Sequence, residues 1–453
     1  MAKVTEMNMT EGSLTKKMVA FAMPVMITSV LQMLFNAADM MVVGSFVGAK
    51  ALAAVGACSP LINLLVTFFT GVSSACNIIV ATYYGANNRR KITKVLHTSI
   101  LVAVIAGILM VLLGEILAVA GLRWMSTPED VMAAAVLYMK IYFLSMPAML
   151  IYNYGAAILR ALGDSRHPLY FLIVSGVLNL VLNLLLVVGF HLEVEGVAIA
   201  TTVSQYVVAA VLLWYLKSID AEYRLNRANM RIDRHELGEL MRLGVPAGIQ
   251  GMLFSVSNIV IQSSINSFGS DIVAACSAVA NVEGIVYVAL SAISQATMSF
   301  TAQNAGAGFM QRVKKVVGIS LLGTALIGGG MSAVLGFFGE PVLRLYTSDS
   351  VVLAAGVYRI QVVCIFYLFC GTMDVFAGCI RGLGYSFLPT VVSLLGACGL
   401  RVLWIITIFA KEQTLYTLYM AYPISWIATS VAHGLCMFIV WKIWEKRRLQ
   451  KNG

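Results

Sequence analysis

The sequence predicts an all-α integral membrane protein with twelve transmembrane helices in two six-helix lobes. Three observations support this fold class. First, 60% of the 453 residues are hydrophobic and 11% are charged, whereas soluble domains are about half apolar and about a quarter charged. Second, the apolar residues fall in long stretches, each near the roughly 20 residues that a helix needs to cross a bilayer. Third, the chain repeats its own pattern at a distance of about half its length.

Twelve apolar stretches each predict one membrane-spanning helix. The first follows a polar start that contains Lys16 and Lys17. Because it is longer than the roughly 7 to 15 residues in the core of a cleaved signal peptide, we expect it to be retained as a span. In chain order, the predicted spans cover residues 17–44, 52–83, 94–120, 132–158, 167–190, 194–217, 238–267, 272–304, 314–339, 351–379, 387–410 and 415–443.

An internal repeat relates the two halves of the chain. Arg160-Ala-Leu-Gly163 recurs 221 positions later as Arg381-Gly-Leu-Gly384, and Pro24 recurs 222 positions later as Pro246. Because each copy contains an even number of spans, both copies enter the membrane in the same direction, and their pseudo-twofold axis lies along the membrane normal. Further pairs at the 221-residue shift are Gly48 with Gly269, Ser73 with Ser294, Lys94 with Lys315 and Ser99 with Ser320.

The repeat and the charges together predict the domain organisation. Residues 218–237 are the one charge-dense stretch between the two sets of spans. We therefore expect an N-lobe over residues 1–217, a cytoplasmic linker over residues 218–237 and a C-lobe with a basic tail over residues 238–453. A substrate path is expected between two lobes that are related in this way.

The net charge of +10 is explained by membrane topology. If the N-terminus is cytoplasmic, 24 of the 31 Lys and Arg residues fall in inside segments, four fall in outside loops and three fall within spans. This is the positive-inside distribution that orients membrane proteins. We therefore expect both termini in the cytoplasm, and the basic excess does not indicate nucleic-acid binding.

Asp39 is the most informative polar residue within a span. Gln32, Asn36 and Asp39 recur at helical spacing and place one polar stripe on the first span. A charged group at the centre of a membrane helix costs about 2.5–3.5 kcal/mol, so such residues are rare and usually functional.

Two further polar faces are predicted at a depth similar to that of Asp39. Asn179 and Asn183 lie one turn apart on the fifth span. The sixth span has a polar face of Thr201, Ser204 and Gln205. One carboxylate with several neutral oxygens suits a monovalent hard cation, and the same buried carboxylate could instead hold a proton. The alternative is that Asn179, Asn183 and Thr201 only form hydrogen bonds between helices. No metal other than sodium is indicated.

Asp374, Arg401 and Glu283 are charged residues predicted within the spans of the second lobe. Asp374 on the tenth span and Arg401 on the eleventh could form a structural ion pair, or they could couple to the ion or substrate. Glu283 lies early in the eighth span, where it could face the cleft or the outer interface.

Two more basic residues, Lys140 and Arg359, lie about eight residues into the fourth and tenth spans. Long basic side chains at such positions can extend towards the membrane surface. For both residues we expect this arrangement, or pairing with Glu115, in preference to a role in transport.

Catalytic and cofactor motifs are not found in the sequence. There is no phosphate-binding Gly-Lys-Ser/Thr loop and no His-Glu-x-x-His motif. The eight cysteines fall within spans and form neither a Cys-x-x-Cys motif nor a Cys/His cluster. We therefore expect a protein that is not an enzyme, has no cofactor and has a coupling ion as its only bound inorganic species.

An ordered set of motifs resembles the multidrug and toxic compound extrusion (MATE) transporters, particularly the bacterial branch. The resemblance extends from about Leu14 to Trp444. The motifs are Pro24 with Asp39-x-x-x-Val-Gly44, Tyr84-Gly-Ala-Asn87, Leu159-Arg-Ala-Leu-Gly-Asp164, Gly196-Val-Ala-Ile-Ala-Thr201, Gln303-Asn-x-Gly-Ala307 and Met373-Asp-Val-x-x-Gly-x-Ile-Arg-Gly382.

The resemblance implies a twelve-helix antiporter of the bacterial cytoplasmic membrane that exports organic, often cationic, compounds in exchange for sodium or protons. It also implies a cation site formed by Asp39, Asn179, Asn183 and Thr201. The second position on the fifth span is often Asp in the family, whereas it is Asn183 here. An acidic residue that some relatives have on the seventh span is replaced by Phe254.

The expected function is therefore secondary-active export of small cationic or amphipathic compounds by alternating access. Membrane lipids are the other expected partners, and no obligatory protein partner is indicated. Three alternatives remain. One is a channel or receptor, which uphill transport driven by an ion gradient would exclude. A lipid or polysaccharide flippase of the same wider superfamily would have a more basic central cavity. A major-facilitator-type transporter would carry an acidic residue in the loop between the second and third spans, which reads Gly85-Ala-Asn-Asn-Arg-Arg90 here.

Overall fold

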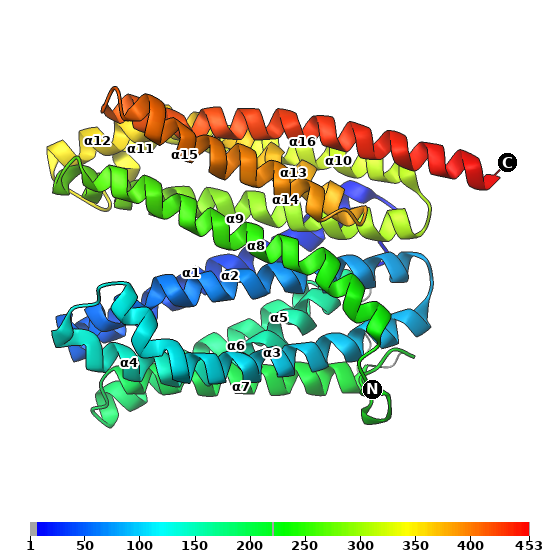
Figure 1. Ribbon diagram of the computed structural model, residues 1–453, viewed down its shortest axis with the longest axis horizontal. Helices are drawn as coiled ribbons and strands as arrows, with labels where there is room; N and C mark the ends of the chain where they lie inside the picture. Colours follow the sequence, from blue (N-terminus) through cyan, green and yellow to red (C-terminus); the bar gives the residue numbers. More distant parts are fainter. Residues whose placement is uncertain (1–6, 220–221, 453) are drawn as a thin grey trace. The chain divides into compact units, whose positions relative to one another are not determined.

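The computed structural model describes residues 7–219 and 222–452, which form long helices joined by short loops (Figure 1). Parts of the predicted N-terminal tail, including Lys3, and residues 220 and 221 of the predicted linker lie outside the described residues. Within the described residues, eleven helices are long and apolar enough to cross a membrane, and the number becomes twelve if one bent pair forms a single span. The predicted all-α membrane fold is confirmed.

The first half of the chain contains helices that correspond to the first six predicted spans. They are α1 (Leu14–Val42), η1 (Val43–Val47), α2 (Ala49–Gly85), α3 (Arg89–Trp124), α4 (Glu129–Phe143), α5 (Met146–Ala161), α6 (Arg166–Asn183), η2 (Leu184–Gly189) and α7 (Val194–Ser218), followed by the short η3 (Arg227–Asn229).

The second half repeats this order. Its helices are α8 (Arg234–Asn266), α9 (Ser270–Gly306), α10 (Met310–Thr324), η4 (Ala325–Gly329), α11 (Gly330–Leu343), α12 (Ser350–Val363), η5 (Cys364–Phe366), α13 (Tyr367–Gly382), α14 (Phe387–Ser393), η6 (Leu394–Gly399), α15 (Leu400–Trp404), η7 (Ile405–Phe409) and α16 (Leu415–Asn452).

The fourth span is broken, although the sequence predicted one continuous helix over residues 132–158. The helix ends at Phe143, and α5 starts at Met146 with a bend of 47° between the two parts. Pro147 lies in the first turn of α5. Proline has no backbone N–H and disfavours the helical conformation of the residue before it, so a continuous helix is not favoured here.

Two compact units make up the structure, and two helices contribute to both. Of the described residues, the first unit contains Met7, Asn8 and those within Met23–Gly248, and the second contains Met9–Ala22 and those from Ile249 onward. The change of unit therefore falls inside α1 and inside α8, within three residues of Pro24 and Pro246 respectively. The unit boundary lies within α8, to the C-terminal side of the predicted linker.

The segment that leads into α1 is held by the second unit. The backbone N–H of Met9 donates to Oε1 of Gln303 at 3.1 Å. Nδ2 of Asn304 donates to the carbonyl of Met9 at 3.2 Å, and Nη2 of Arg312 donates to the carbonyl of Gly12 at 3.2 Å. These bonds anchor the segment before α1 to the last turn of α9 and the first turn of α10.

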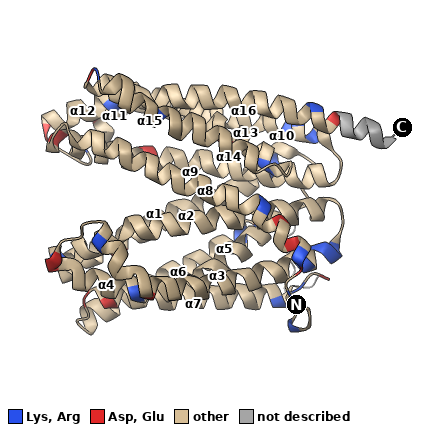
Figure 2. Cartoon of the chain, viewed as in Figure 1, with Lys and Arg blue, Asp and Glu red and all other residues tan. Residues whose placement is uncertain are grey.

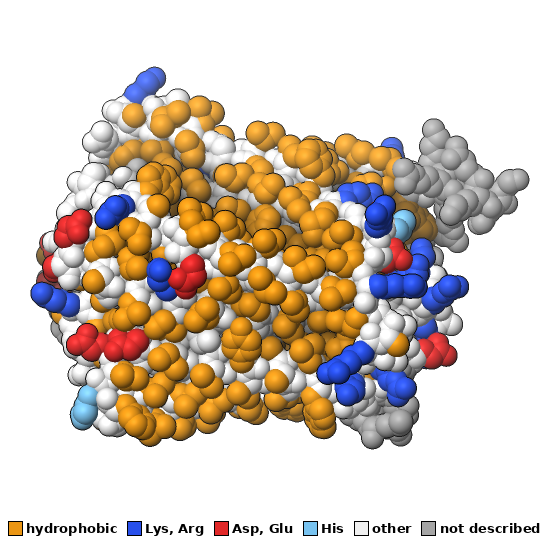
Figure 3. All heavy atoms as spheres, turned by 60° about the horizontal axis from the view of Figure 1, so that its bottom comes forward, with side chains coloured by type: hydrophobic (Ala, Val, Ile, Leu, Met, Phe, Trp, Pro, Cys, Tyr) orange, Lys and Arg blue, Asp and Glu red, His pale blue; other side chains and the backbone are white. Residues whose placement is uncertain are grey.

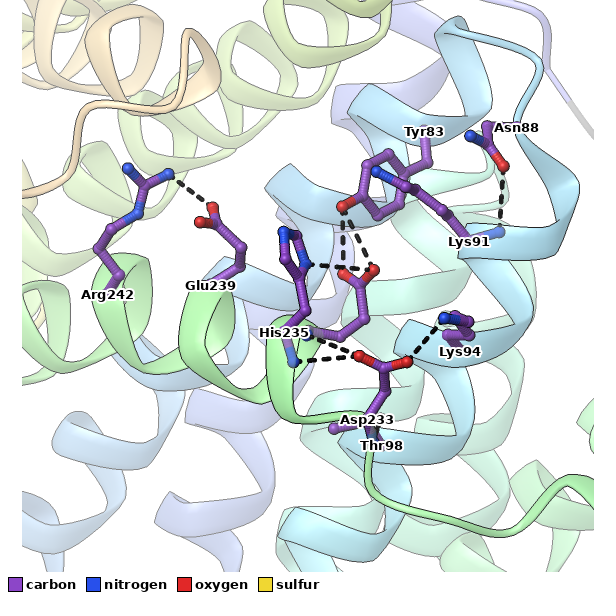
Figure 4. Close-up of polar contacts among 10 residues, drawn as sticks. Tyr83, Asn88, Lys91, Lys94, Thr98, Asp233, His235, Glu239 and Arg242 are labelled. Atoms are coloured by element: carbon purple, nitrogen blue, oxygen red, sulfur yellow. Dashed lines mark hydrogen bonds and ion pairs between the residues drawn. The ribbon is translucent and has the colours of Figure 1, made fainter.

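The segment that leads into α8 is held by the first unit in a corresponding way (Figure 4). Asn226 donates its backbone N–H to Nε2 of His97 at 3.0 Å. Asp233 donates its backbone N–H to Oγ1 of Thr98 at 3.0 Å, and its carboxylate lies 2.7 Å from Nζ of Lys94. The internal repeat therefore includes the segments before α1 and α8, since each is held by hydrogen bonds to the other helices of its unit.

The repeated glycines mark equivalent turns in the two halves. Gly48 and Gly269 precede α2 and α9 with φ angles of 116° and 93°. Gly163 and Gly384 follow α5 and α13 with φ angles of 91° and 88°. Glycine has no Cβ and adopts positive φ without the steric cost that other residues incur. The sequence repeat is therefore retained where the backbone requires glycine.

The outer surface of the helices is apolar. Figure 3 shows one face as a hydrophobic band with charged side chains concentrated at its two ends. In the first unit, Lys and Arg gather at the end where α3 begins (Figure 2). Such a surface is suited to lipid because hydrocarbon offers charged side chains no solvation. Exposed apolar residues of α3 include Ile105, Ile108, Leu109, Leu112, Ile116 and Leu117.

Candidate functional site

Asp39, Asn179, Asn183 and Thr201 meet in one chain of hydrogen bonds within the first unit. Nδ2 of Asn183 donates to Oδ1 of Asp39 at 2.6 Å and to Oδ1 of Asn179 at 3.3 Å. Nδ2 of Asn179 then donates to Oγ1 of Thr201 at 3.3 Å. The structure thus brings together the four residues that the sequence singled out on α1, α6 and α7.

Close helix packing produces this arrangement. A Cβ at Gly176 on α6 would collide with the ring of Phe35, so Gly176 allows α1 to approach α6 one turn before the site. Ser175 donates its hydroxyl to the carbonyl of Ser204 at 3.1 Å, which joins α6 to α7 at the same level. The three helices therefore present their polar side chains towards one another.

One buried acceptor at the site has no hydrogen-bond partner. The side chain of Asn183 is fully buried, and its Oδ1 receives no hydrogen bond in the structure. Both N–H groups of its amide already donate, to Asp39 and to Asn179. A buried polar atom without a partner is costly. The half-buried carboxylate of Asp39 and this oxygen leave the site rich in acceptors and short of donors.

Two of the site helices, α1 and α6, change from α-helical to π-helical hydrogen bonding next to the site. The π-helical segment η1 begins at Val43, four residues after Asp39, and η2 begins immediately after Asn183. A π-helical turn weakens regular backbone bonding and is frequent at functional sites. The hydrophobic pattern of the sequence carries no signal for these segments, and the sequence analysis did not predict them.

Three neighbouring residues lie beside the four predicted site residues. Tyr138 and Tyr142 lie close enough to interact electrostatically with the Asp39 carboxyl group. Gln205 lies one turn after Thr201 on α7, and its buried Oε1 also receives no hydrogen bond. The sequence predicts that Gln205 shares a polar face with Thr201, whereas it does not place Tyr138 and Tyr142.

Gln32 and Asn36, the rest of the predicted polar stripe, are exposed on α1. They do not take part in the hydrogen-bond chain of the site within the described residues. The stripe therefore divides into an exposed part and the half-buried Asp39.

In the second unit, Glu283 and Arg359 form a buried ion pair. Nε and Nη2 of Arg359 donate to the two carboxylate oxygens of Glu283 at 3.2 and 2.9 Å. Glu283 and Arg359 are only 9% and 4% exposed. Arg359 therefore neither extends to the membrane surface nor pairs with Glu115, which corrects the expectation from the sequence. The sequence feature that could have predicted this pair is the similar depth of Glu283 and Arg359 along α9 and α12.

Arg401 and Asp374 are not brought together as an ion pair. Nε of Arg401 donates to Oγ of Ser425 at 2.8 Å, and its guanidinium lies 4.8 Å from the ring centroid of Tyr422 and 5.7 Å from that of Trp426. Aromatic faces attract such a cation. Arg401 is 4% exposed and forms no ion pair with any residue that the structure describes.

Two other intramembrane polar residues have local partners. Nζ of Lys140 lies 3.0 Å from Oε2 of Glu115, which confirms the predicted pairing. His433 is fully buried, and its Nε2 lies 2.9 Å from Oγ of Ser393. Both contacts join neighbouring spans and lie apart from the hydrogen-bond chain of Asp39.

Comparison with known proteins agrees with this architecture. The chain is 29% identical over 449 residues to the probable multidrug resistance protein YoeA of Bacillus subtilis, covering 97% of this chain and 96% of that protein. It is 28% identical over 325 residues to an FAD transporter of Shewanella oneidensis, covering 70% and 71%.

A solved structure has the same fold. It is described as the outward-facing conformation of a multidrug resistance MATE family transporter, and it superposes with a TM-score of 0.91 at 19% identity. The alignment covers 98% of this chain and 100% of that one. The MatE family model matches twice, over residues 24–185 and 246–407, which is the same 222-residue offset that relates Pro24 to Pro246. The chain therefore belongs to the MatE family.

Proposed function

We propose that this protein exports small organic compounds, cationic or amphipathic, in exchange for sodium or protons that bind at Asp39. Membership of the MatE family and the name of the Bacillus subtilis relative support the multidrug class. Family membership also removes the major-facilitator alternative. We further propose that the protein lies in the bacterial cytoplasmic membrane with both termini in the cytoplasm, in agreement with the positive-inside distribution.

The observation that carries this proposal is the unpartnered Oδ1 of Asn183 beside the Asp39 carboxylate. A site with one carboxylate and surplus neutral oxygens binds a small cation, since carboxylate and carbonyl oxygens are hard ligands. A proton is the second species that could neutralise the Asp39 carboxylate. A protonated Asp39 could donate to an amide oxygen, and rotation of the Asn183 amide would provide that acceptor.

Cation binding at Asp39 would drive the transport cycle. It neutralises the one carboxylate of the hydrogen-bond chain, and the lobes then favour one orientation because the cost of the buried charge has been removed. One positive charge moving inward through 100 mV provides about 2.3 kcal/mol, which supports a gradient of about fiftyfold for an uncharged substrate. One-for-one exchange with a singly charged cation moves no net charge, so the concentration gradient of the ion alone drives it.

The test is a flux assay in proteoliposomes with a cationic dye. A sodium gradient and a proton gradient are imposed separately on vesicles that contain the wild type, Asp39→Asn or the control Asp130→Asn. Asp130 lies in the exposed first turn of α4, and the control makes the same chemical change outside the site. We expect one gradient to drive dye transport in the wild type and the control, and neither gradient to do so in Asp39→Asn. Uphill transport at wild-type rate by Asp39→Asn would refute the proposal.

Organic anions are a second candidate substrate class, which the buried and unpaired guanidinium of Arg401 favours. A relative of this chain is named an FAD transporter. The same vesicles can be tested with FAD. Transport of FAD in the wild type that is lost in Arg401→Gln, with dye transport unchanged, would support this class. The flippase alternative is tested by translocation of a fluorescent phospholipid in the same vesicles.

A further inference from the structure

A cavity of about 350 Å³ lies in the first unit, where α3 begins, and most of its charged residues are basic. One side comes from the first two turns of α3, and the other comes from the segment between α7 and α8. Four basic and two acidic residues give the lining a net charge of +2. The lining residues are Arg89, Arg90, Thr93, Lys94, Glu222, Asn229, Arg231 and Asp233.

One oppositely charged pair in this lining is already satisfied. Nζ of Lys94 lies 2.7 Å from Oδ2 of Asp233. The other oxygen, Oδ1, accepts the backbone N–H groups of His235 and Glu236 at 3.0 and 3.3 Å (Figure 4). The Asp233 carboxylate therefore has three contacts, one with Lys94 and two with backbone N–H groups at the start of α8, and it is not available to the arginines.

The three arginines of the lining have no such partners. Arg89, Arg90 and Arg231 are exposed, and their side chains form no ion pair with any residue in the described ranges. A guanidinium group stays charged at all relevant pH values, so these groups repel one another across the cavity. Glu222 contributes one opposing charge but is itself exposed. An anion in the cavity would relieve the repulsion.

The location of the cavity indicates which anion it accommodates. Arg89 and Arg90 precede the apolar part of α3, which begins with the fully buried Ile92 and continues as a membrane span. Residues immediately before a span lie at the level of the lipid headgroups. Basic pockets at this level of a membrane protein bind anionic headgroups. Thr93 and Asn229 add neutral hydrogen-bonding groups to the lining.

We propose that this cavity binds the phosphate of an anionic phospholipid headgroup through Arg89, Arg90 and Arg231. The planar guanidinium group matches the geometry of phosphate oxygens and can donate two parallel hydrogen bonds. The bound headgroup would join the start of α3 to the segment that leads into α8. The site is separate from Asp39 and requires no particular transported compound.

The test measures the thermal stability of the purified full-length protein in a neutral detergent. Short-chain phosphatidylglycerol, short-chain phosphatidylcholine and inorganic phosphate are titrated separately. The test variant is the double substitution Arg89→Gln and Arg231→Gln. The control is Lys91→Gln with Arg242→Gln, which removes the same charge near the cavity but not from its lining. Lys91 lies 4.9 Å from the ring centroid of Tyr83, and Arg242 lies 2.5 Å from Glu239.

We expect phosphatidylglycerol to raise the melting temperature of the wild type and the control, and phosphatidylcholine to have no effect. The test variant should need about thirtyfold more phosphatidylglycerol for the same rise, because two basic contacts are lost. If inorganic phosphate alone gives the rise and the test variant loses it, the cavity binds phosphate from a soluble source. Equal responses to the two lipids without a phosphate response, or equal responses in the test and control variants, would overturn the proposal. Melting temperatures without additives establish that each variant is folded.

Discussion

Breaking the Glu283–Arg359 pair on one side should destabilise the protein more than removing both charges. The two hydrogen bonds of this pair are 3.2 and 2.9 Å long, and both residues are buried. Loss of one partner from a buried ion pair costs about 3–5 kcal/mol because the other charge is left uncompensated. Removal of both charges leaves no such charge, so we expect the double variant Glu283→Gln with Arg359→Gln to cost only about 1–2 kcal/mol.

The two single variants should differ in their dependence on pH. In Glu283→Gln the guanidinium remains charged, with some compensation from the rings of Tyr419 and Tyr422 at 5.6 and 5.7 Å. In Arg359→Gln the remaining carboxyl group can take up a proton and become neutral, which the guanidinium cannot do by losing one. The cost of Arg359→Gln should therefore fall as the pH is lowered from 8 to 5, while the cost of Glu283→Gln should stay constant.

The assay is unfolding in mixed micelles with increasing denaturing detergent, at both pH values, for the wild type, the two single variants and the double variant. The coupling free energy is the sum of the single costs minus the cost of the double variant. We expect it to be several kcal/mol at pH 8. Additive single costs, or a pH dependence in Glu283→Gln rather than in Arg359→Gln, would show that the reasoning about uncompensated charge is wrong.

Three other predictions follow from the structure. Asn183→Asp places a second carboxyl group beside Asp39 and should add one cation per transport cycle. The measurement is the membrane potential at which net substrate flux stops, which should shift in the variant; an unchanged potential would contradict the prediction. Gly163→Ala should be more destabilising than Gly48→Ala. Both positions have positive φ, which costs about 1–3 kcal/mol for alanine, but only at Gly163 does a Cβ meet a neighbour, the carbonyl oxygen of Met7 at 2.5 Å; equal melting temperatures would count against this. Lys94 holds the pKa of Asp233 in the folded protein below its usual range. The pair therefore stabilises the fold at pH values above the pKa that Asp233 has in the unfolded chain, and this contribution is lost as the pH falls through the lower pKa of the folded state. Asp233→Asn should therefore lower stability at pH 7 by less than about 1 kcal/mol, and the difference from the wild type should vanish in strong acid; a difference that grows in acid would refute the sign.

Much of the candidate site was accessible from the sequence because intramembrane polar residues are rare. Asp39, Asn179, Asn183 and Thr201 stood out against apolar spans, and their positions along the helices predicted a common depth. Their mutual contacts could not be derived in this way. Helical spacing specifies a face and a depth, but it does not specify which face of a neighbouring helix lies opposite.

The charged residues of the second unit show where this limit applies. The sequence suggested Asp374 with Arg401, whereas the structure pairs Glu283 with Arg359 and places Arg401 against aromatic rings. In each case the residue types and depths were compatible with several partners. The choice depends on how α9, α12 and α16 rotate about their axes, and packing of side chains along the whole length of each helix decides that rotation.

By itself, the sequence determined the membrane class, the number of spans and the internal repeat, because hydrophobic length and glycine positions are local properties that the bilayer and the backbone impose on each segment separately. The tertiary structure alone decided the exchange of the leading segments of α1 and α8 between the two units and the unpartnered oxygen of Asn183. These features depend on contacts between residues far apart in the chain, and the energy of such a contact is set by the geometry of both partners.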